Sequence, residues 1–143
     1  MALSDFKRKL TPKGLEQADK VGKFLVRNGL LPEAIVTSPV VRARQTAKAV
    51  AKKLGSAGLV EGGWLACGMT PETCFEELQA YAKMTSVMLV GHEPDFGDTI
   101  ASLVGMADSG AVTIRKASLT AIDVQGLRPG GGQLQLLVPV RLM

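Results

Sequence analysis

Two residues of types that bind phosphoryl groups follow the ends of two apolar runs in this chain of 143 residues. His92, the single histidine, comes shortly after the run 87–90, and Arg42 follows the run 34–37. An imidazole titrates near neutral pH, and a guanidinium can hold an oxyanion through two parallel hydrogen bonds. If the two runs are neighbouring parallel strands, both side chains lie at the sheet edge where ligands of α/β proteins bind. The pair therefore predicts an oxyanion pocket of the kind that phosphoryl transfer requires.

Each of these residues also has a simpler interpretation when it is taken alone. His92 could be a strand-end side chain with a satisfied hydrogen bond, and Arg42 and Arg44 could be exposed charges on a helix. The placement of Arg42 in the first turn of a helix, whose N-terminus already favours anions, supports the anion site. Glu93 and Asp95, beside His92, are expected to charge the start of the next helix.

Helices and strands that alternate along most of the chain are predicted to position these side chains. The hydrophobic periodicity predicts helices over 12–28, 39–54, 71–83 and 94–103 and strands over 34–37, 59–61, 87–90, 119–124 and 134–138. Three helices begin at a hydroxyl residue followed by proline, a cap and a first-turn residue: Thr11-Pro12, Ser38-Pro39 and Thr70-Pro71. The alternation predicts an α/β fold with a mostly parallel sheet and helices on both faces. The last two strands, joined through the glycines 130–132, are predicted to form a hairpin.

Composition favours one globular domain over residues 1–143. Hydrophobic residues make up 46% of the chain and charged residues 21%, which argues against a disordered protein. No stretch approaches the roughly 20 apolar residues of a membrane span, and the first residues do not read as a signal peptide. We therefore expect no membrane partner.

The cysteines and the net charge limit the kinds of partner. Cys67 and Cys74 are the only cysteines, which fits a reducing cytoplasm, and their spacing with His92 matches no zinc pattern. We expect neither a metal nor a cofactor. The net charge of +4 attracts anions, but aromatic residues make up only 4% of the chain, which argues against a reader of single-stranded nucleic acid.

Three segments in this order, 10–18, 37–47 and 90–94, resemble successive motifs of the histidine phosphatase superfamily. The pattern Ser-Pro-x-x-Arg-Ala-x-Gln-Thr-Ala over 38–47 carries most of the resemblance. The short distance between the second and third segments is similar to the SixA-like phosphohistidine phosphatases. The resemblance implies a three-layer, phosphoglycerate mutase-like α/β sandwich and a phosphomonoester or phosphoramidate substrate.

The resemblance also implies roles for individual residues. Arg42 matches the second phosphate-binding arginine of the family, and His92 matches its second active-site histidine. Arg8, just before the Leu-Thr pair at 10–11, aligns with an arginine that faces the phosphate. The nucleophile of the family is the histidine of an Arg-His-Gly or Arg-His-Ala motif at the end of its first strand, and this sequence contains no such motif.

The missing motif leads to an expectation about the whole chain. We expect a single histidine-phosphatase-like domain that is truncated at its N-terminus and lacks the first strand, an interior member of the family's sheet. Without the nucleophile, the covalent route through a phosphohistidine intermediate is closed. The chain is therefore expected to be inactive as a phosphatase and, with two strand edges unpaired, poorly stable alone.

Three hypotheses for function remain open. The first is a cytoplasmic SixA-like phosphatase that acts on a phosphohistidine-bearing protein or a small phosphorylated molecule. The second is a non-catalytic phosphate-binding or protein-interaction module. The third is a basic adaptor that binds acidic partners or nucleic acid through Lys7, Arg8 and Lys9. The predicted clustering of Arg42 with His92 favours a localised anion site over a diffuse basic surface.

Overall fold

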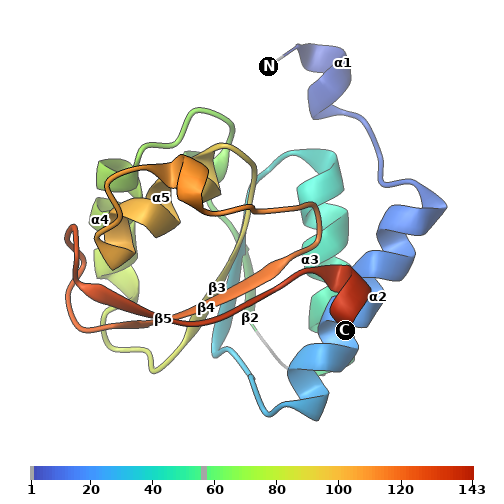
Figure 1. Ribbon diagram of the computed structural model, residues 1–143. Helices are drawn as coiled ribbons and strands as arrows, with labels where there is room; N and C mark the ends of the chain where they lie inside the picture. Colours follow the sequence, from blue (N-terminus) through green and yellow to red (C-terminus); the bar gives the residue numbers. More distant parts are fainter. Residues whose placement is uncertain (1, 56–57) are drawn as a thin grey trace.

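Helices and strands alternate through most of the chain in the computed structural model, which describes residues 2–55 and 58–143 (Figure 1). The α-helices are α1 (Leu3–Phe6), α2 (Pro12–Arg27), α3 (Val41–Leu54), α4 (Pro71–Leu78) and α5 (Asp95–Val104). The strands are β1 (Ala34–Thr37), β2 (Gly58–Glu61), β3 (Val87–Val90), β4 (Leu119–Val124) and β5 (Gly132–Val138). The 3-10 helices are η1 (Gly63–Leu65), η2 (Gln79–Tyr81), η3 (Ser109–Ala111) and η4 (Val140–Leu142).

The strands form one parallel sheet and one antiparallel pair. The parallel sheet has the order β2-β1-β3, so β1 lies in its centre. Strands β4 and β5 form the predicted hairpin, with an irregularity in register between Ala121 and Ile122. The predicted combination of a mostly parallel sheet with a C-terminal hairpin is confirmed.

Helices cover both faces of the parallel sheet. Successive side chains of β1 point to opposite faces, so neighbouring residues of this strand pack against different helices. Ile35, fully buried, packs in one cluster with buried side chains of α2 and α3. Val36, also fully buried, packs in a second cluster with Leu65 of η1 and Cys74 of α4. Figure 1 shows α2 and α3 on one side of the strands and α4 and α5 on the other. The predicted three-layer sandwich is therefore present.

Four strands have a free edge within the residues that the structure describes, and β3 and β4 are two of them. Strand β3 pairs only with β1, and β4 pairs only with β5. Each strand thus presents one row of backbone N–H and C=O groups that no strand of residues 2–55 and 58–143 pairs with. Met88 of β3 and Leu119 of β4 nevertheless pack on the same buried cluster, so the two sheets share a core.

Two of the three predicted hydroxyl caps are confirmed, and the third is wrong. Thr11 accepts a hydrogen bond from the Gly14 amide at the start of α2, and Thr70 caps α4 in the same way. By contrast, α3 begins only at Val41, and its N-cap residue makes no side-chain cap bond. Ser38 lies two residues before that N-cap, and its hydroxyl oxygen accepts from the Val40 amide and also contacts a side chain on a later strand connection, described below.

The boundaries of two other elements differ from the prediction by two residues or more. The helix predicted to reach residue 83 ends as an α-helix at Leu78, and η2 continues the chain for one tighter turn. Strand β5 begins at Gly132, two residues earlier than predicted. A Cβ atom at Gly132 would lie 2.8 Å from side-chain atoms of Ile122 and Leu103, so glycine permits this close approach.

No helix within the described part of the chain is long and apolar enough to cross a membrane.

Candidate anion-binding site

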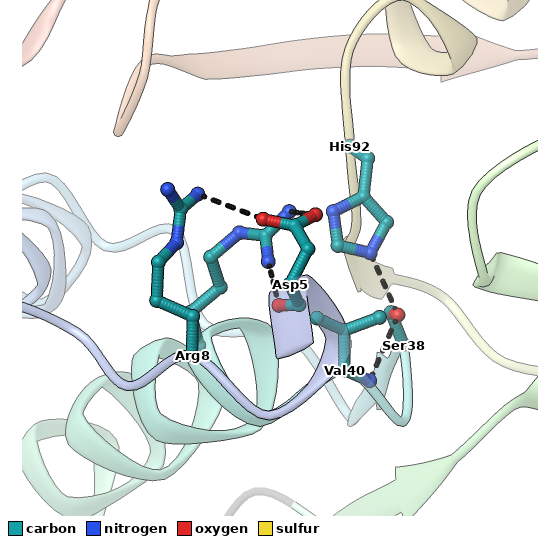
Figure 2. A network of polar contacts seen from close by, with 6 residues as sticks. Asp5, Arg8, Ser38, Val40 and His92 are labelled. Atoms are coloured by element: carbon teal, nitrogen blue, oxygen red, sulfur yellow. Dashed lines mark hydrogen bonds and ion pairs between the residues drawn. The ribbon is translucent and has the colours of Figure 1, made fainter. Parts of the chain in front are cut away.

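The parallel pairing of β1 with β3 brings two strand ends together. Thr37 and Val90 are partners in the register, and the Ser38 amide donates to the Val90 carbonyl oxygen at 2.9 Å. Ser38 and His92 therefore leave the sheet at the same edge, as predicted for parallel neighbours. The His92 Nε2 atom lies 2.7 Å from the Ser38 Oγ atom (Figure 2).

Arg42 reaches this edge from the first turn of α3, where its side chain is about three-quarters buried, with 24% exposed. Its Nη1 atom donates to the Asp5 carbonyl oxygen at 2.9 Å, and its Nη2 atom lies 3.6 Å from Asp5 Oδ2. The guanidinium of Arg8 lies 3.5 Å from the other oxygen of the same carboxylate. The carboxylate of Asp5 is thus placed between two guanidinium groups.

The electrostatics of His92 link it to the same group of charges. Burial lowers the pKa of His92, and the positive charge of Arg42 lowers it further, while the carboxylates of Asp95 and Asp5 oppose both effects. In Figure 2 the Nδ1 side of the imidazole faces the Asp5 side chain. The three residues predicted to face a phosphate, Arg42, His92 and Arg8, therefore gather around one carboxylate. A carboxylate has the charge and the oxygen acceptors that a phosphoryl group would also present.

Two other charged residues near the motifs, Arg44 and Glu93, contact other groups. Arg44 forms an ion pair with Glu61 of β2 at 3.1 Å, away from His92. Glu93 accepts a hydrogen bond from the Gly97 amide at 2.8 Å, as expected for a residue that stabilises the start of α5.

Asp95 lies in the first turn of α5, as predicted, and has a second role as well. It is buried, and its Oδ2 atom accepts hydrogen bonds from the amides of Gly68 and Met69 at 2.8 and 3.1 Å. Asp95 thus charges the start of α5 and also connects this helix to the loop before α4.

Neither the contact of Ser38 with His92 nor that of Asp5 with Arg42 is predicted from the sequence. The Ser38-Pro39 pair predicts a helix cap, although the position of Ser38 directly after an apolar strand, close to that of His92 after another, indicates a shared sheet edge. Asp5 carries no comparable signal, because its partner Arg42 lies 37 residues away in sequence.

The cysteines lie apart from this site. Cys67 is exposed, whereas burial raises the pKa of the Cys74 thiol to about 11. A thiol with such a pKa stays protonated at neutral pH, and the thiolate is the form that binds metals. Across residues 2–55 and 58–143, no group of three or more His, Cys, Asp or Glu side chains could hold a metal ion.

Comparison with known proteins places the chain in a family. Residues 4–81 match the model of the histidine phosphatase superfamily (branch 1). The chain belongs to this superfamily. An uncharacterised protein of Picosynechococcus sp. (strain ATCC 27264 / PCC 7002 / PR-6) is 33% identical over 137 residues, which cover 92% of this chain and 78% of that protein.

Solved structures of SixA proteins share the fold. The protein histidine phosphatase SixA complexed with tungstate superposes with a TM-score of 0.87 at 21% identity, over 99% of this chain and 90% of that one. A candidate phosphohistidine phosphatase SixA from Nakamurella multipartitia gives a TM-score of 0.79 at 26% identity, over 96% and 87% of the two chains. The superfamily and the fold together indicate a hydrolase of the phosphatase type.

Proposed function

We propose that this protein is a SixA-like phosphatase acting on phosphohistidine in a protein or on a small phosphomonoester. Residues 1–143 would supply its anion site but not its nucleophile. The observation that carries this proposal is the convergence of Arg42 and His92 on the position of the Asp5 carboxylate. The binding of tungstate, a tetrahedral oxyanion, to a SixA protein of the same fold supports it. We place the activity in the cytoplasm, on the basis of the two free cysteines.

Arg42 and His92 suit the charge that develops during phosphoryl transfer. The substrate's non-bridging oxygens carry negative charge throughout the displacement, and donors already in position stabilise it without reorganisation. Arg42 offers two N–H groups from one rigid guanidinium, next to the N-terminus of α3. His92 presents the Nδ1 side of its ring towards Asp5, where an N–H group would add a further donor.

The nucleophile is a separate requirement. In the family resemblance it is the histidine of an Arg-His-Gly or Arg-His-Ala motif, which would form the N–P bond as the leaving group departs. His92, the one histidine of this sequence, follows Gly91 and is held through Nε2 by Ser38. We therefore infer that residues 1–143 alone do not turn over substrate.

A turnover assay tests this inference. The purified 143-residue chain is incubated with a phosphohistidine peptide and with p-nitrophenyl phosphate, and we expect no phosphate release above the blank. Release that the Arg42→Ala variant abolishes would contradict the inference, because a contaminating phosphatase would be unaffected by that change.

Anion binding is tested separately by calorimetric titration with orthovanadate. Loss of a charge-assisted hydrogen-bonding partner costs about 1.5–3 kcal/mol, so Arg42→Ala is expected to weaken binding by roughly tenfold or more. Arg44→Ala is the matched control, because Arg44 lies in the same turn of the helix but pairs with Glu61. Absence of binding, or equal binding by the wild type and the Arg42→Ala variant, would refute the anion site.

The presence of a single histidine in the sequence favours a second candidate function, a non-catalytic phosphate-binding or protein-interaction module. It makes the same prediction for orthovanadate. The two functions differ in the fate of a phosphorylated partner in the cell. A phosphatase would hydrolyse the phosphoryl group, whereas a module would bind the partner without hydrolysing it.

A further inference from the structure

The Ser38 side chain lies behind the candidate anion site and is fully buried, with 0% exposed. Its Oγ atom accepts a hydrogen bond from the Val40 amide at 3.2 Å and lies 2.7 Å from His92 Nε2. Because the hydroxyl is fully buried, neither a substrate nor water reaches it as an alternative hydrogen-bonding partner. Ser38 therefore acts through the imidazole that it contacts.

We propose that Ser38 is a positioning residue that donates its hydroxyl proton to Nε2 of neutral His92 and thereby keeps the ring proton on Nδ1. The Nδ1–H group then faces the anion site, where Asp5 now lies (Figure 2). The inference rests on the proposed anion site and adds which ring nitrogen of its histidine carries the proton that is donated.

The direction of the hydrogen bond follows from counting protons. The Val40 N–H can only donate, so Ser38 Oγ is already an acceptor in one contact. Its own proton needs an acceptor, and His92 Nε2 is the atom in hydrogen-bond range that can provide a lone pair. In the opposite tautomer, Oγ would receive two donors and its proton would have no partner among the contacts seen. Buried donors without partners are disfavoured, so the Nδ1–H tautomer is selected.

The tautomer matters because the imidazole is neutral when the pH is near 7. Burial and the charge of Arg42 lower its pKa, and the carboxylates of Asp5 and Asp95 only partly offset them. A neutral ring presents either a donor or a lone pair on its Nδ1 side. Nδ1–H donates to a phosphoryl oxygen, whereas a lone pair there would repel it. The same proton prevents Nδ1 from attacking phosphorus, so His92 is a donor and not the nucleophile.

Nuclear magnetic resonance of the ring nitrogens tests the proposal, since a single histidine gives a single pair of signals. In 15N-labelled wild-type chain, at a pH well above the pKa of His92, we expect a protonated Nδ1 and an unprotonated Nε2. Ser38→Ala should move the equilibrium towards the Nε2–H form, and Ser38→Thr, which keeps the hydroxyl, should restore Nδ1–H. Thr46→Ala is the control, because it removes another hydroxyl bond near the site, to the Arg42 carbonyl oxygen at 3.0 Å.

Either of two results would overturn the proposal. One is an Nε2–H tautomer in the wild type, which needs no variant to fold. The other is an unchanged tautomer in a Ser38→Ala variant whose amide spectrum shows native dispersion. The test is made without any ligand, so it is independent of the proposed function. If the tautomer behaves as expected but inorganic phosphate does not bind, Ser38 positions the ring and the anion-binding function fails.

Discussion

The carboxylate of Asp5 is the chain's own anion at the candidate site. It lies between the guanidinium groups of Arg42 and Arg8, and Arg42 also donates to the Asp5 carbonyl oxygen. An incoming phosphoryl group would have to displace this carboxylate or share Arg42 with it. At the scale of single residues, Asp5 is therefore a competitor of the ligand.

Removal of this carboxylate is predicted to strengthen phosphate binding. Partly exposed ion pairs contribute up to about 1 kcal/mol, so Asp5→Asn should tighten binding of inorganic phosphate by about two- to fivefold. The measurement is a calorimetric titration of both proteins. Asp19→Asn is the matched control, since Asp19 pairs with Lys23 and Lys53 on α2 and α3. Weaker phosphate binding by the Asp5→Asn variant would show that Asp5 supports the site rather than competing for it.

The lowered pKa of His92 predicts a pH dependence of stability. Between the ordinary value of 6.5 and the lower folded-state pKa, the unfolded chain binds a proton that the folded chain does not. The free energy of unfolding therefore falls as the pH decreases below about 6.5, and the contribution of His92 is fully present above that value.

Urea unfolding at pH values above and below this window measures the effect. A His92→Gln variant, which lacks the titrating group, should lose less free energy of unfolding over the same interval than the wild type. Equal losses in the two proteins would assign the pH dependence to other groups.

Sequence could identify Arg42 and His92 because each follows a clear apolar strand. The positions of Ser38 and Asp5 depend on which strands pair and on where the first residues of the chain lie. Ser38 offers a hydroxyl that suits a cap, and only the pairing of β1 with β3 brings it to His92 instead. The Asp5 contact joins parts of the chain that no local pattern connects.

At the scale of elements, the connection between α5 and the loop before α4 depends on one buried carboxylate. Asp95 accepts from the amides of Gly68 and Met69, so Asp95→Ala would leave two donors without this partner. We expect the free energy of unfolding to fall by about 1–3 kcal/mol. Asp98→Ala, a change of the same kind in the first turn of the same helix, controls for the helix dipole. If urea unfolding gives equal losses of free energy for both variants, the contact of Asp95 with the loop adds nothing to the effect of the helix dipole.

Elements were predictable where the deciding interactions are local. The caps at Thr11 and Thr70 lie within three residues of the amides that they accept from, so the pattern finds them. The end of α4 depends on packing with other elements, since Leu78 and Tyr81 both pack on the cluster around Val36. Periodicity continues through this change of helix type and cannot show where it occurs.

At the scale of the whole molecule, the free edges of β3 and β4 predict low stability for the 143-residue chain. Each edge leaves backbone groups without a strand partner, in a protein whose core includes half-buried side chains such as Met88 and Leu119. We expect a thermal midpoint below the range of about 45–65 °C that is common among domains of mesophiles. Circular dichroism with a mass measurement checks this, and a cooperative melt of a monomer above that range would refute it.

The central claim is that Arg42 and His92 bind one and the same anion. The most direct measurement is a titration of the 15N-labelled chain with inorganic phosphate, followed at the ring nitrogens of His92. The claim predicts a saturable change of the Nδ1 signal in the wild type and in Arg44→Ala, and its loss in Arg42→Ala. Phosphate that binds without moving the Nδ1 signal, or that moves it equally in the Arg42→Ala variant, would contradict the claim.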